Sequence, residues 1–403
     1  MSAPADSSDR RYLLVTMPAG PFARHLAKAL GERGALTRRV VMNGGDVADW
    51  GLSQAERFNA PSETFRPWIE AVIATGGYTD VVVFNDTNPY SQEALEAARA
   101  AGRRTWILEN GYQRPDWITL ETQGVNARSG LPRDPAAYDD ADRLAPPEDG
   151  PHLGQITPFH VYNTIRYFTC MVAMSPWMRG YRYPYTVTIA GQVFGHVRRF
   201  GAWLVSRNAR DRQAERVARL TPYMLVCLQR EGDSQLMVHS DLKTNRAFLT
   251  TVLDSFAAHA PADLRLVVKN HPLDPGVEDL ERVTLDLATE RGVRHRVSFL
   301  EGGAFAALAR AARGVISVNS TAALAAIGFG VPVKLLGRAF FDIEGLVDRR
   351  PLDDFWREQS APDAGLFHRF RRRMSVETQV YGSYHNPRHL DATAARIAAR
   401  LMG

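Results

Sequence analysis

The amino-acid sequence predicts an α/β protein with two Rossmann-like halves, and three observations lead to this class. Short apolar segments alternate with helical ones along the chain, as in a parallel sheet whose strands are connected by helices. Polar turns follow the apolar segments, which places them at the edge of a sheet where ligands bind. The length of 403 residues suggests two domains of ordinary size.

The first half of the chain supplies four of the predicted strands. Its elements are expected, in order, as a strand at 12–17, a helix at 22–33 that Gly34 ends, strands at 38–42 and 81–84, a helix at 92–101 and a strand at 105–108. Polar turns close three of these strands, at Asn43 to Asp46, at Asn85-Asp86 and at Glu109 to Tyr112. We expect these turns to be the ligand-bearing segments of the first half.

The middle of the chain differs from both halves. Residues 133–152 are rich in Pro, Asp and Ala and are expected to form a surface loop. Aromatic residues and arginines alternate from about 156 to 215, with Trp177, Arg198-Arg199 and Trp203 as examples. One interpretation is a set of helices that pack on the first half and lead to the second. The other is a basic, aromatic face that binds anionic lipid headgroups.

The second half repeats the alternation of strand and helix. Its elements are expected, in order, as a strand at 223–228, a helix at 245–259, strands at 264–268 and 297–300, a helix at 304–312, a strand at 314–316, a helix at 322–329 and a helical tail around 367–374. Two such halves resemble the GT-B-like plan, in which two Rossmann-like domains face each other across a cleft. The expected domains are 1–215, on the acceptor side, and 216–403, which binds the nucleotide sugar.

Composition and charge narrow the possible partners. The net charge of +5 and the isoelectric point of about 9.3 are mildly basic, and most of the basic residues are arginines. Heavy use of arginine and alanine is also typical of a GC-rich genome, which would explain the basic balance without any partner. The alternative is an anionic partner, either a membrane surface or a phosphorylated substrate. No nucleic-acid-binding motif is present, so no nucleic acid is expected.

Cysteine usage and hydropathy indicate the compartment. Cys170 and Cys227 both lie in apolar surroundings, without a CxxC motif, as expected of thiols in a reducing environment. The apolar run after the polar N-terminus is too short for a signal peptide, and no stretch has the length of a membrane span. We therefore expect a cytoplasmic protein, peripheral on the inner face of the cytoplasmic membrane if it binds lipid.

Two polar segments in the second half carry the strongest functional signal. Lys269-Asn270-His271-Pro272 follows one predicted strand, and Ser317-Val318-Asn319-Ser320-Thr321 follows another and precedes a helix of small residues. The first N–H groups of a helix and its dipole favour an anion such as phosphate. Strand, hydroxyl-rich turn and helix together are typical of a nucleotide-sugar site.

Several segments resemble one family, the capsule polysaccharide biosynthesis proteins of the KpsS/LipB type. The resemblance covers residues 12–385, and it depends on the order of the segments and on their positions at strand ends. The segments are Asn43 to Asp46, Glu109 to Tyr112 with Arg114 to Glu121, Leu228 to Gln235 with His239-Ser240, Lys269 to Pro272, Ser317 to Thr321 and Gln379 to Tyr384.

The resemblance implies a retaining β-Kdo transferase. Such an enzyme takes Kdo from CMP-β-Kdo and places it on a phosphatidylglycerol-type lipid, or on a Kdo-primed acceptor, in the synthesis of the capsule linker. The implied partners are the nucleotide-sugar donor, the lipid acceptor, the anionic inner-membrane surface and other capsule synthesis and export proteins. A chain of 403 residues has room for one GT-B unit, as in the single-Kdo initiator.

CMP-Kdo has one phosphate to neutralise, and side chains can do this without a metal ion. The candidate CMP-binding and phosphate-binding residues are Lys269, His271, Pro272, Ser317, Asn319, Ser320 and Thr321. No metal-binding motif stands out, so neither a cofactor nor a metal is expected.

Retention of configuration requires a carboxylate nucleophile, and the sequence offers three candidate catalytic residues. Asp233 is the first choice because it lies in a glycine-containing loop at a strand end, with Glu231 two residues before it. The alternative is that one of this pair caps the following helix. Glu109 ends a strand of the first half and is the candidate acid/base, with Glu121 a weaker one. The predicted cleft would bring Glu109 and Asp233 together.

The carboxylate of Kdo and the acceptor require further polar groups. Arg114, Arg230 and Lys243 are candidates for holding the sugar carboxylate, and the sequence does not choose among them. The remaining candidate sugar or acceptor residues are Gln229, Asn43 and Asp46.

Two other functions fit the same residues. An inverting CMP-sialic acid transferase would use Asp233 as a general base instead of a nucleophile. A non-catalytic GT-B-like factor for capsule assembly or export would keep the fold but would not need both the carboxylate pair and the phosphate-binding segments.

Overall fold

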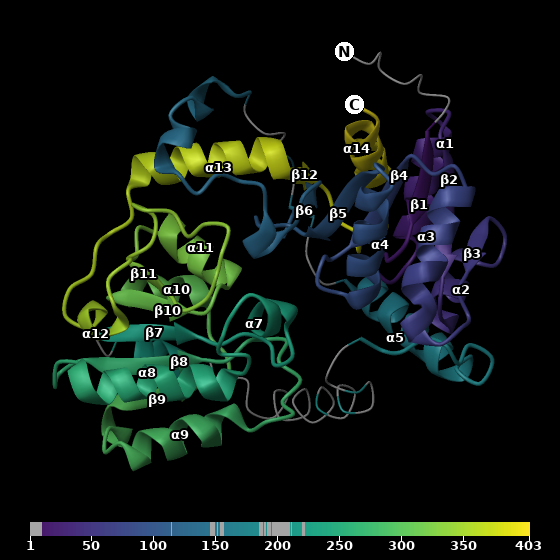
Figure 1. Cartoon of the computed structure of the whole chain (residues 1–403). Helices are drawn as coiled ribbons and strands as arrows, with labels where there is room; N and C mark the ends of the chain where they lie inside the picture. The colour runs from purple at the N-terminus through teal and green to yellow at the C-terminus, as the bar shows by residue number, and fades with distance from the viewer. Residues whose placement is uncertain are drawn as a thin grey trace. The chain divides into compact units, whose positions relative to one another are not determined.

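The computed structural model describes residues 10–113, 115–145, 150, 152–153, 157–184, 188, 191, 195, 210, 212–219 and 222–403. The chain forms two compact units (Figure 1). The first unit combines Met1–Gly130, Leu144–Pro184 and Arg372–Gly403, and the second combines Leu131–Arg143 and Tyr185–Arg371. The C-terminal segment of the chain therefore belongs to the first unit.

The first unit is built on a seven-stranded sheet in the order β12-β6-β5-β4-β1-β2-β3. The strands are β1 (Arg11–Leu14), β2 (Leu36–Val41), β3 (Ala55–Arg57), β4 (Asp80–Phe84), β5 (Arg104–Asn110), β6 (Trp117–Glu121) and β12 (Gln379–Tyr381). Strands β1 to β5 are parallel in the common Rossmann order 3-2-1-4-5, whereas β6 is antiparallel to β5 and to β12.

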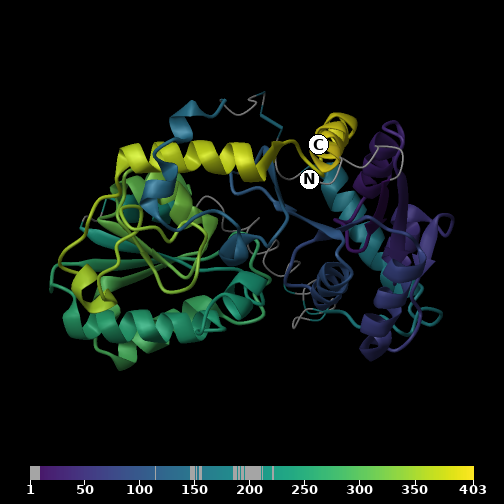
Figure 2. The ribbon, with the colours of Figure 1, turned by 45° about the horizontal axis from the view of Figure 1, so that its top comes forward.

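Helices cover both faces of this sheet. They are α1 (Phe22–Gly31), α2 (Gly44–Trp50), α3 (Phe65–Thr75), α4 (Pro89–Ala100), α5 (Pro158–Ala173) and α14 (Leu390–Met402). Side chains of a strand alternate between two cores: Tyr12 and Leu14 pack with α1 and α14, and Leu13 and Val15 pack with α3 and α4. Helix α14 lies beside α1 in both views (Figure 1 and Figure 2).

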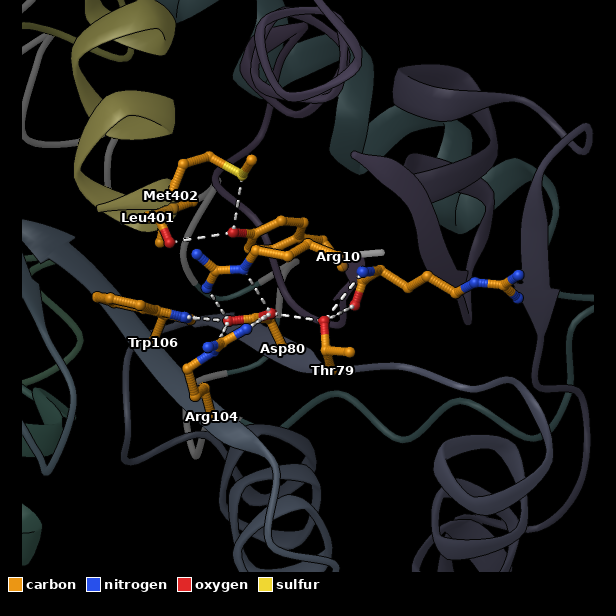
Figure 3. A network of polar contacts seen from close by, with 9 residues as sticks. Arg10, Thr79, Asp80, Arg104, Trp106, Leu401 and Met402 are labelled. Carbon is orange, nitrogen blue, oxygen red and sulfur yellow. Dashed lines mark hydrogen bonds and ion pairs between the residues drawn. The ribbon is translucent and has the colours of Figure 1, made fainter. Parts of the chain in front are cut away.

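A buried carboxylate connects the amino ends of three strands in this unit (Figure 3). Asp80, the first residue of β4, accepts hydrogen bonds from Arg10 at 2.7 Å, from Arg104 at 2.9 Å and from Trp106 at 2.8 Å. Burial by itself would raise the pKa of Asp80, but these hydrogen bonds outweigh it and hold the pKa below its ordinary value. The cluster lies at the edge opposite to the polar turns, so its role is structural.

The second unit contains a five-stranded parallel sheet in the order β11-β10-β7-β8-β9. The strands are β7 (Tyr223–Cys227), β8 (Arg265–Lys269), β9 (Val297–Leu300), β10 (Gly314–Ser317) and β11 (Val333–Leu335). The helices are α7 (Ser234–Val238), α8 (Asn245–His259), α9 (Leu280–Glu290), α10 (Phe305–Ala311), α11 (Thr321–Gly328), α12 (Leu352–Phe355) and α13 (Ala364–Thr378), whose last residues belong to the first unit. This sheet repeats the Rossmann order, with its own core around Val226, Phe256 and Trp356.

The two sheets confirm the predicted α/β class with two Rossmann-like units. Several elements were not predicted, among them the short strand β3 and the helices α3 and α9. Asn43 to Asp46 were interpreted as a turn, but Gly44 to Asp46 begin α2, because Asn43 caps the helix by accepting hydrogen bonds from the N–H groups of Gly45 and Asp46. Much of the predicted aromatic and basic region, including Arg198-Arg199 and Trp203, lies outside the described residues.

Candidate functional site

The predicted phosphate-binding segments meet at one edge of the second sheet. Strands β10, β7 and β8 are neighbours, and their last residues are in register, with Cys227 paired to both Ser317 and Lys269. The loops that follow these strands therefore begin side by side. The edge is formed by the carboxyl ends of parallel strands, which is where ligands bind in this type of sheet.

Gln229 joins two of these loops. Its Nε2 donates a hydrogen bond to Oδ1 of Asn319 at 2.7 Å, and Asn319 in turn donates to the main-chain oxygen of Arg338 at 3.2 Å. The side chain of Gln229 is 4% exposed. In this position Gln229 and Asn319 hold the loops after β7 and β10 together, and their roles toward a sugar or a phosphate stay predictions.

Glu231 is attached to the start of α8. Its Oε2 accepts hydrogen bonds from Nδ2 of Asn245 at 2.7 Å and from the N–H of Asn245 at 3.3 Å. Burial, which is the largest influence, raises the pKa of Glu231, although the hydrogen bonds from Asn245 act in the opposite direction. This contact matches the alternative in which one carboxylate of the pair serves a helix terminus.

Asp233 occupies a different position in the same loop. Gly232 has a φ of +74°, a conformation that favours glycine, and the N–H of Asp233 donates to the main-chain oxygen of Arg230 at 3.0 Å. The main-chain oxygen of Asp233 accepts from the N–H groups of Leu236 and Met237, at the start of α7. The side chain is partly exposed. Glu231 is partly exposed as well, so exposure does not distinguish the two carboxylates.

Two residues of this site were not predicted. Asp274 is 1% exposed and accepts hydrogen bonds from the N–H of Glu231 at 2.9 Å and of Gly276 at 2.8 Å, so it ties the loop after β8 to the loop after β7. Asn245 is fully buried and donates to the main-chain oxygen of Gln229 at 2.8 Å. The sequence Asp274-Pro275-Gly276 is a turn signal, and attention to it would have identified Asp274.

Lys269 and His271 follow β8 directly. Lys269 is 8% exposed, and its Nζ donates to the main-chain oxygen of Asn270 at 3.3 Å. Nδ1 of His271 accepts a hydrogen bond from the N–H of Leu273 at 3.1 Å, which assigns the proton of the neutral ring to Nε2. His271 is partly exposed and Pro272 is exposed. In this tautomer the ring N–H of His271 is at Nε2, close to the carboxyl edge of the sheet.

The hydroxyl-rich turn leads into α11. Ser317 is fully buried, and its hydroxyl donates to the main-chain oxygen of Cys227 at 3.4 Å. Ser320 is the N-cap of α11, where its Oγ accepts from the N–H of Ala322 at 3.2 Å, and Thr321 is the first residue of the helix. Ser320 and Thr321 are partly exposed, so they are the accessible hydroxyls of this turn.

The three basic residues predicted to hold the sugar carboxylate differ in their surroundings. Lys243 is exposed, has a φ of +63°, and donates from Nζ to the main-chain oxygen of Met237 at 2.9 Å. Arg230 is half-buried in the loop after β7. Arg114 lies outside the described residues. Among the described residues, no group of three or more His, Cys, Asp or Glu side chains is placed to hold a metal ion.

Glu109 lies at the end of β5 in the first unit. It is 9% exposed, and its Oε1 accepts from the N–H of Asn110 at 2.9 Å. Asn110 and His385 line a cavity of about 30 Å³, the size of roughly one water molecule.

Glu121, the weaker candidate, accepts hydrogen bonds from Tyr112 at 2.8 Å and from Ser129 at 2.6 Å, which indicates a structural role. The joint action of Glu109 and Asp233 stays a prediction.

Asn43 and Asp46 have structural partners. Asn43 donates from Nδ2 to the hydroxyl of Tyr167 at 3.2 Å, and Asp46 accepts from Arg39 at 2.8 Å and from Tyr167 at 3.1 Å. Between them, a Cβ on Gly44 would lie 2.2 Å from the main-chain oxygen of Cys170. This motif therefore seats α5 against α2, and its predicted contact with a sugar or an acceptor stays untested.

Sequence comparison places the chain among known proteins. A family model described as capsule polysaccharide biosynthesis protein matches residues 79–385. The chain belongs to this family. It is 31% identical over 393 residues to the capsule polysaccharide export protein KpsS of Escherichia coli, with 94% of this chain and 97% of that protein covered.

Further relatives agree with this family. The capsule polysaccharide modification protein LipB of Neisseria meningitidis serogroup B is 33% identical over 395 residues, covering 94% of this chain and 92% of LipB. A solved structure of the Thermosulfurimonas dismutans KpsC β-Kdo 2,7 transferase is similar at 14% identity and a TM-score of 0.44, over 97% of this chain and 100% of that chain. The family assignment rests on the sequence matches.

Proposed function

We propose that this capsule polysaccharide biosynthesis protein is a glycosyltransferase that moves Kdo from CMP-β-Kdo to a phosphatidylglycerol-type lipid or a Kdo-primed acceptor, with retention of configuration. The observation that carries the proposal is the set of adjacent strand ends in the second unit, where the loops after β7, β8 and β10 begin side by side. These three loops contain carboxylates, a lysine, a histidine and a helix N-cap, and the chain that carries them belongs to the capsule polysaccharide biosynthesis family.

The phosphate of CMP would bind between β8 and α11. Ser320 uses its oxygen to cap α11, so its hydroxyl hydrogen is the part that a phosphate oxygen would accept. The first N–H groups of α11 favour a negative charge, and the Nε2–H of His271 is a second donor. Charge-assisted hydrogen bonds of this kind stabilise the leaving phosphate without a metal ion.

Asp233 is the proposed nucleophile toward the reacting carbon of Kdo. Glu231 is less suited, because Asn245 holds its carboxylate at the start of α8. In the proposed reaction the carboxylate of Asp233 displaces CMP. The acceptor hydroxyl, which gives its proton to a general base, then displaces Asp233, so two inversions give net retention. The first step breaks the bond between the sugar and the phosphate oxygen, and the electron pair leaves with CMP.

Calorimetric titration with CMP tests the binding site. His271→Ala and Ser320→Ala should each weaken CMP binding by roughly 1–3 kcal/mol, the range for one lost hydrogen bond to a charged group. His295→Ala, an exposed histidine of the same unit that lies before β9, should leave the affinity unchanged. Unchanged affinity in both site variants would remove this site from the proposal.

A donor screen tests the reaction. Turnover of CMP-Kdo with a phosphatidylglycerol-like acceptor, followed by mass spectrometry of the product, is the expected result. Turnover of CMP-Neu5Ac would favour the inverting sialic acid alternative, and turnover of neither donor would favour the non-catalytic one. Asp233→Asn should abolish turnover with CMP binding retained, whereas near-normal rates in this variant would exclude Asp233 as the nucleophile. Glu109→Gln should slow the transfer.

A further inference from the structure

Helix α5 presents two different faces. Its inner face packs on α2, where Gly44 and Gly45 allow the close approach and Arg166 forms an ion pair with Asp49. Its outer residues recur at helical spacing, and each of them is exposed. These residues are Pro158, Val161, Tyr162, Ile165, Thr169, Val172 and Ala173. The outer face therefore carries no charged side chain along the 16 residues of the helix.

This outer face is unusually apolar for a surface helix. Val161, Tyr162, Ile165 and Val172 are 48–63% exposed, and Trp177, just beyond the helix, is 72% exposed. Five of the nine large apolar side chains that are exposed in the described part of the chain lie in this short segment. Such a concentration marks an interaction surface, since isolated exposed apolar residues are ordinary but contiguous ones are not.

The surroundings of this face are basic. No Asp or Glu occurs between residues 150 and 184, a span that contains three arginines. A surface groove of about 730 Å³ lies next to the end of α5, between the segments 59–63 and 176–182. Its lining includes the exposed guanidinium groups of Arg179 and Arg182, with Glu63 as the acidic exception. On the inner side, Asp46 and Asp49 are already paired with Arg39 and Arg166.

We propose that the outer face of α5, together with Trp177 and the arginine-lined groove, is the surface by which this protein docks on an anionic lipid bilayer. The apolar side chains would enter the boundary between headgroups and acyl chains, and Arg179 and Arg182 would bind lipid phosphates. A bilayer fits better than a protein partner, because an apolar stripe flanked by exposed arginines matches the apolar interior and the anionic headgroups of a membrane, and neither feature requires one particular partner surface. The inference agrees with a lipid acceptor, but its test does not depend on transferase activity.

Vesicle co-sedimentation tests this surface with the full chain. The parent should bind phosphatidylglycerol-containing vesicles, with binding that falls as salt screens the arginines, and should bind neutral phosphatidylcholine vesicles weakly. The triple variant Val161→Gln, Ile165→Gln, Val172→Gln should reduce binding by roughly tenfold or more, because three inserted apolar side chains are lost. Arg179→Gln with Arg182→Gln should reduce binding mainly at low salt.

Matched controls distinguish binding through this surface from non-specific adsorption of the protein to vesicles. Leu36 of β2 is 60% exposed in the same unit, so Leu36→Gln should leave vesicle binding unchanged. Parent-like binding by the folded triple variant would overturn the inference, as would equal binding to neutral vesicles. Self-association of the parent that the triple variant abolishes, without vesicle binding, would instead identify a contact between copies of this chain and also overturn it. The triple variant should bind CMP with the affinity of the parent. This titration distinguishes a failure of the membrane-binding surface from a failure of the donor site.

Discussion

Asp274 illustrates how single side chains shape the candidate site. Its two oxygens accept hydrogen bonds from the N–H groups of Glu231 and Gly276, and its burial makes both hydrogen bonds hard to replace. Asn245 plays a similar part by contacting both Gln229 and Glu231. A site built in this way keeps its loops in place before a ligand arrives, so less ordering is required on binding.

The stacked rings of His160 and His385 predict an acid-sensitive contact in the first unit. Their centroids are 3.6 Å apart at an interplanar angle of 7°, and burial, together with the neighbouring His160, lowers the pKa of His385 from 6.5 to about 3. Between these two values the unfolded chain binds a proton that the folded chain does not. Stability should therefore fall as the pH falls below about 6.5, by up to about 1.4 kcal/mol per pH unit.

Urea unfolding at a series of pH values measures this effect. His385→Gln should unfold with a shallower dependence on pH than the parent, whereas His295→Gln, at an exposed position, should keep the parent's dependence. Identical slopes for His385→Gln and the parent would show that the ring pair does not control acid stability.

The buried Asp80 cluster predicts a large loss of stability from a small change. Asp80→Asn removes one charge and almost no volume, and it leaves Arg10 buried without its counter-ion. Breaking a buried pair in this way costs roughly 3–5 kcal/mol. Asp391→Asn is the control, because Asp391 pairs with His25 at 73% exposure and its loss should leave the stability close to that of the parent. Equal midpoints for the two variants in denaturant titrations would contradict this prediction.

At the scale of elements, the packing of α5 on α2 explains the Asn43-Gly44-Gly45-Asp46 motif. Asn43 caps α2, the two glycines admit the backbone of α5 and the ring of Tyr167, and Asp46 is bound to that tyrosine and to Arg39. The same contact turns the apolar stripe of α5 outward. The motif therefore sets the orientation of α5 on α2.

Two alanine substitutions test this packing. Gly44→Ala should destabilise by roughly 1–3 kcal/mol, because the new methyl group would meet the backbone of α5 and two elements must move apart. Gly31→Ala, at the end of α1 with nothing within 4 Å of the new atom, should be neutral or stabilise by up to about 1 kcal/mol through helix propensity. Thermal melts compare the two, and similar melting temperatures would argue against close packing at Gly44.

At the scale of the whole molecule, each unit has its own sheet and its own hydrophobic core. The first unit has cores on both faces of its sheet, with Leu26 and Ile69 as examples, and the second has a core around Trp356. The chain leaves and re-enters the first unit, whose edge strand β12 and helix α14 come from its last 25 residues. Removal of this C-terminal segment would strip one core of the first unit of seven of its 22 buried residues.

Hydrogen exchange shows whether the donor site is confined to one unit. CMP should slow amide exchange in the loops after β7, β8 and β10, because a ligand that binds only the native state suppresses local opening around its site. Peptides from β1 and β4, in the first unit, should exchange at unchanged rates in the first seconds of labelling. Early protection restricted to the first unit would contradict the proposal, because the nucleotide would then bind at the other sheet.

The amino-acid sequence was enough to predict the fold class, the two Rossmann-like halves, the family and the strand ends that are candidates for binding the ligand. These features are local: an apolar run predicts a buried strand, and the polar residues after it mark the sheet edge, whatever the strand's neighbours are. The Lys269 to Pro272 and Ser317 to Thr321 segments were found in this way, and both follow neighbours of β7.

The folded structure was needed to establish which strand ends lie together and which polar residues already have protein partners. Strand order depends on contacts between residues far apart in the chain, such as Gln379 with Thr119, and no local period encodes them. The same holds for Glu231 and Asn43, whose partners Asn245 and Tyr167 lie far from them in the sequence. A polar residue at a strand end looks the same in sequence whether it binds a ligand or a neighbouring loop, because the two roles differ only in what surrounds the side chain.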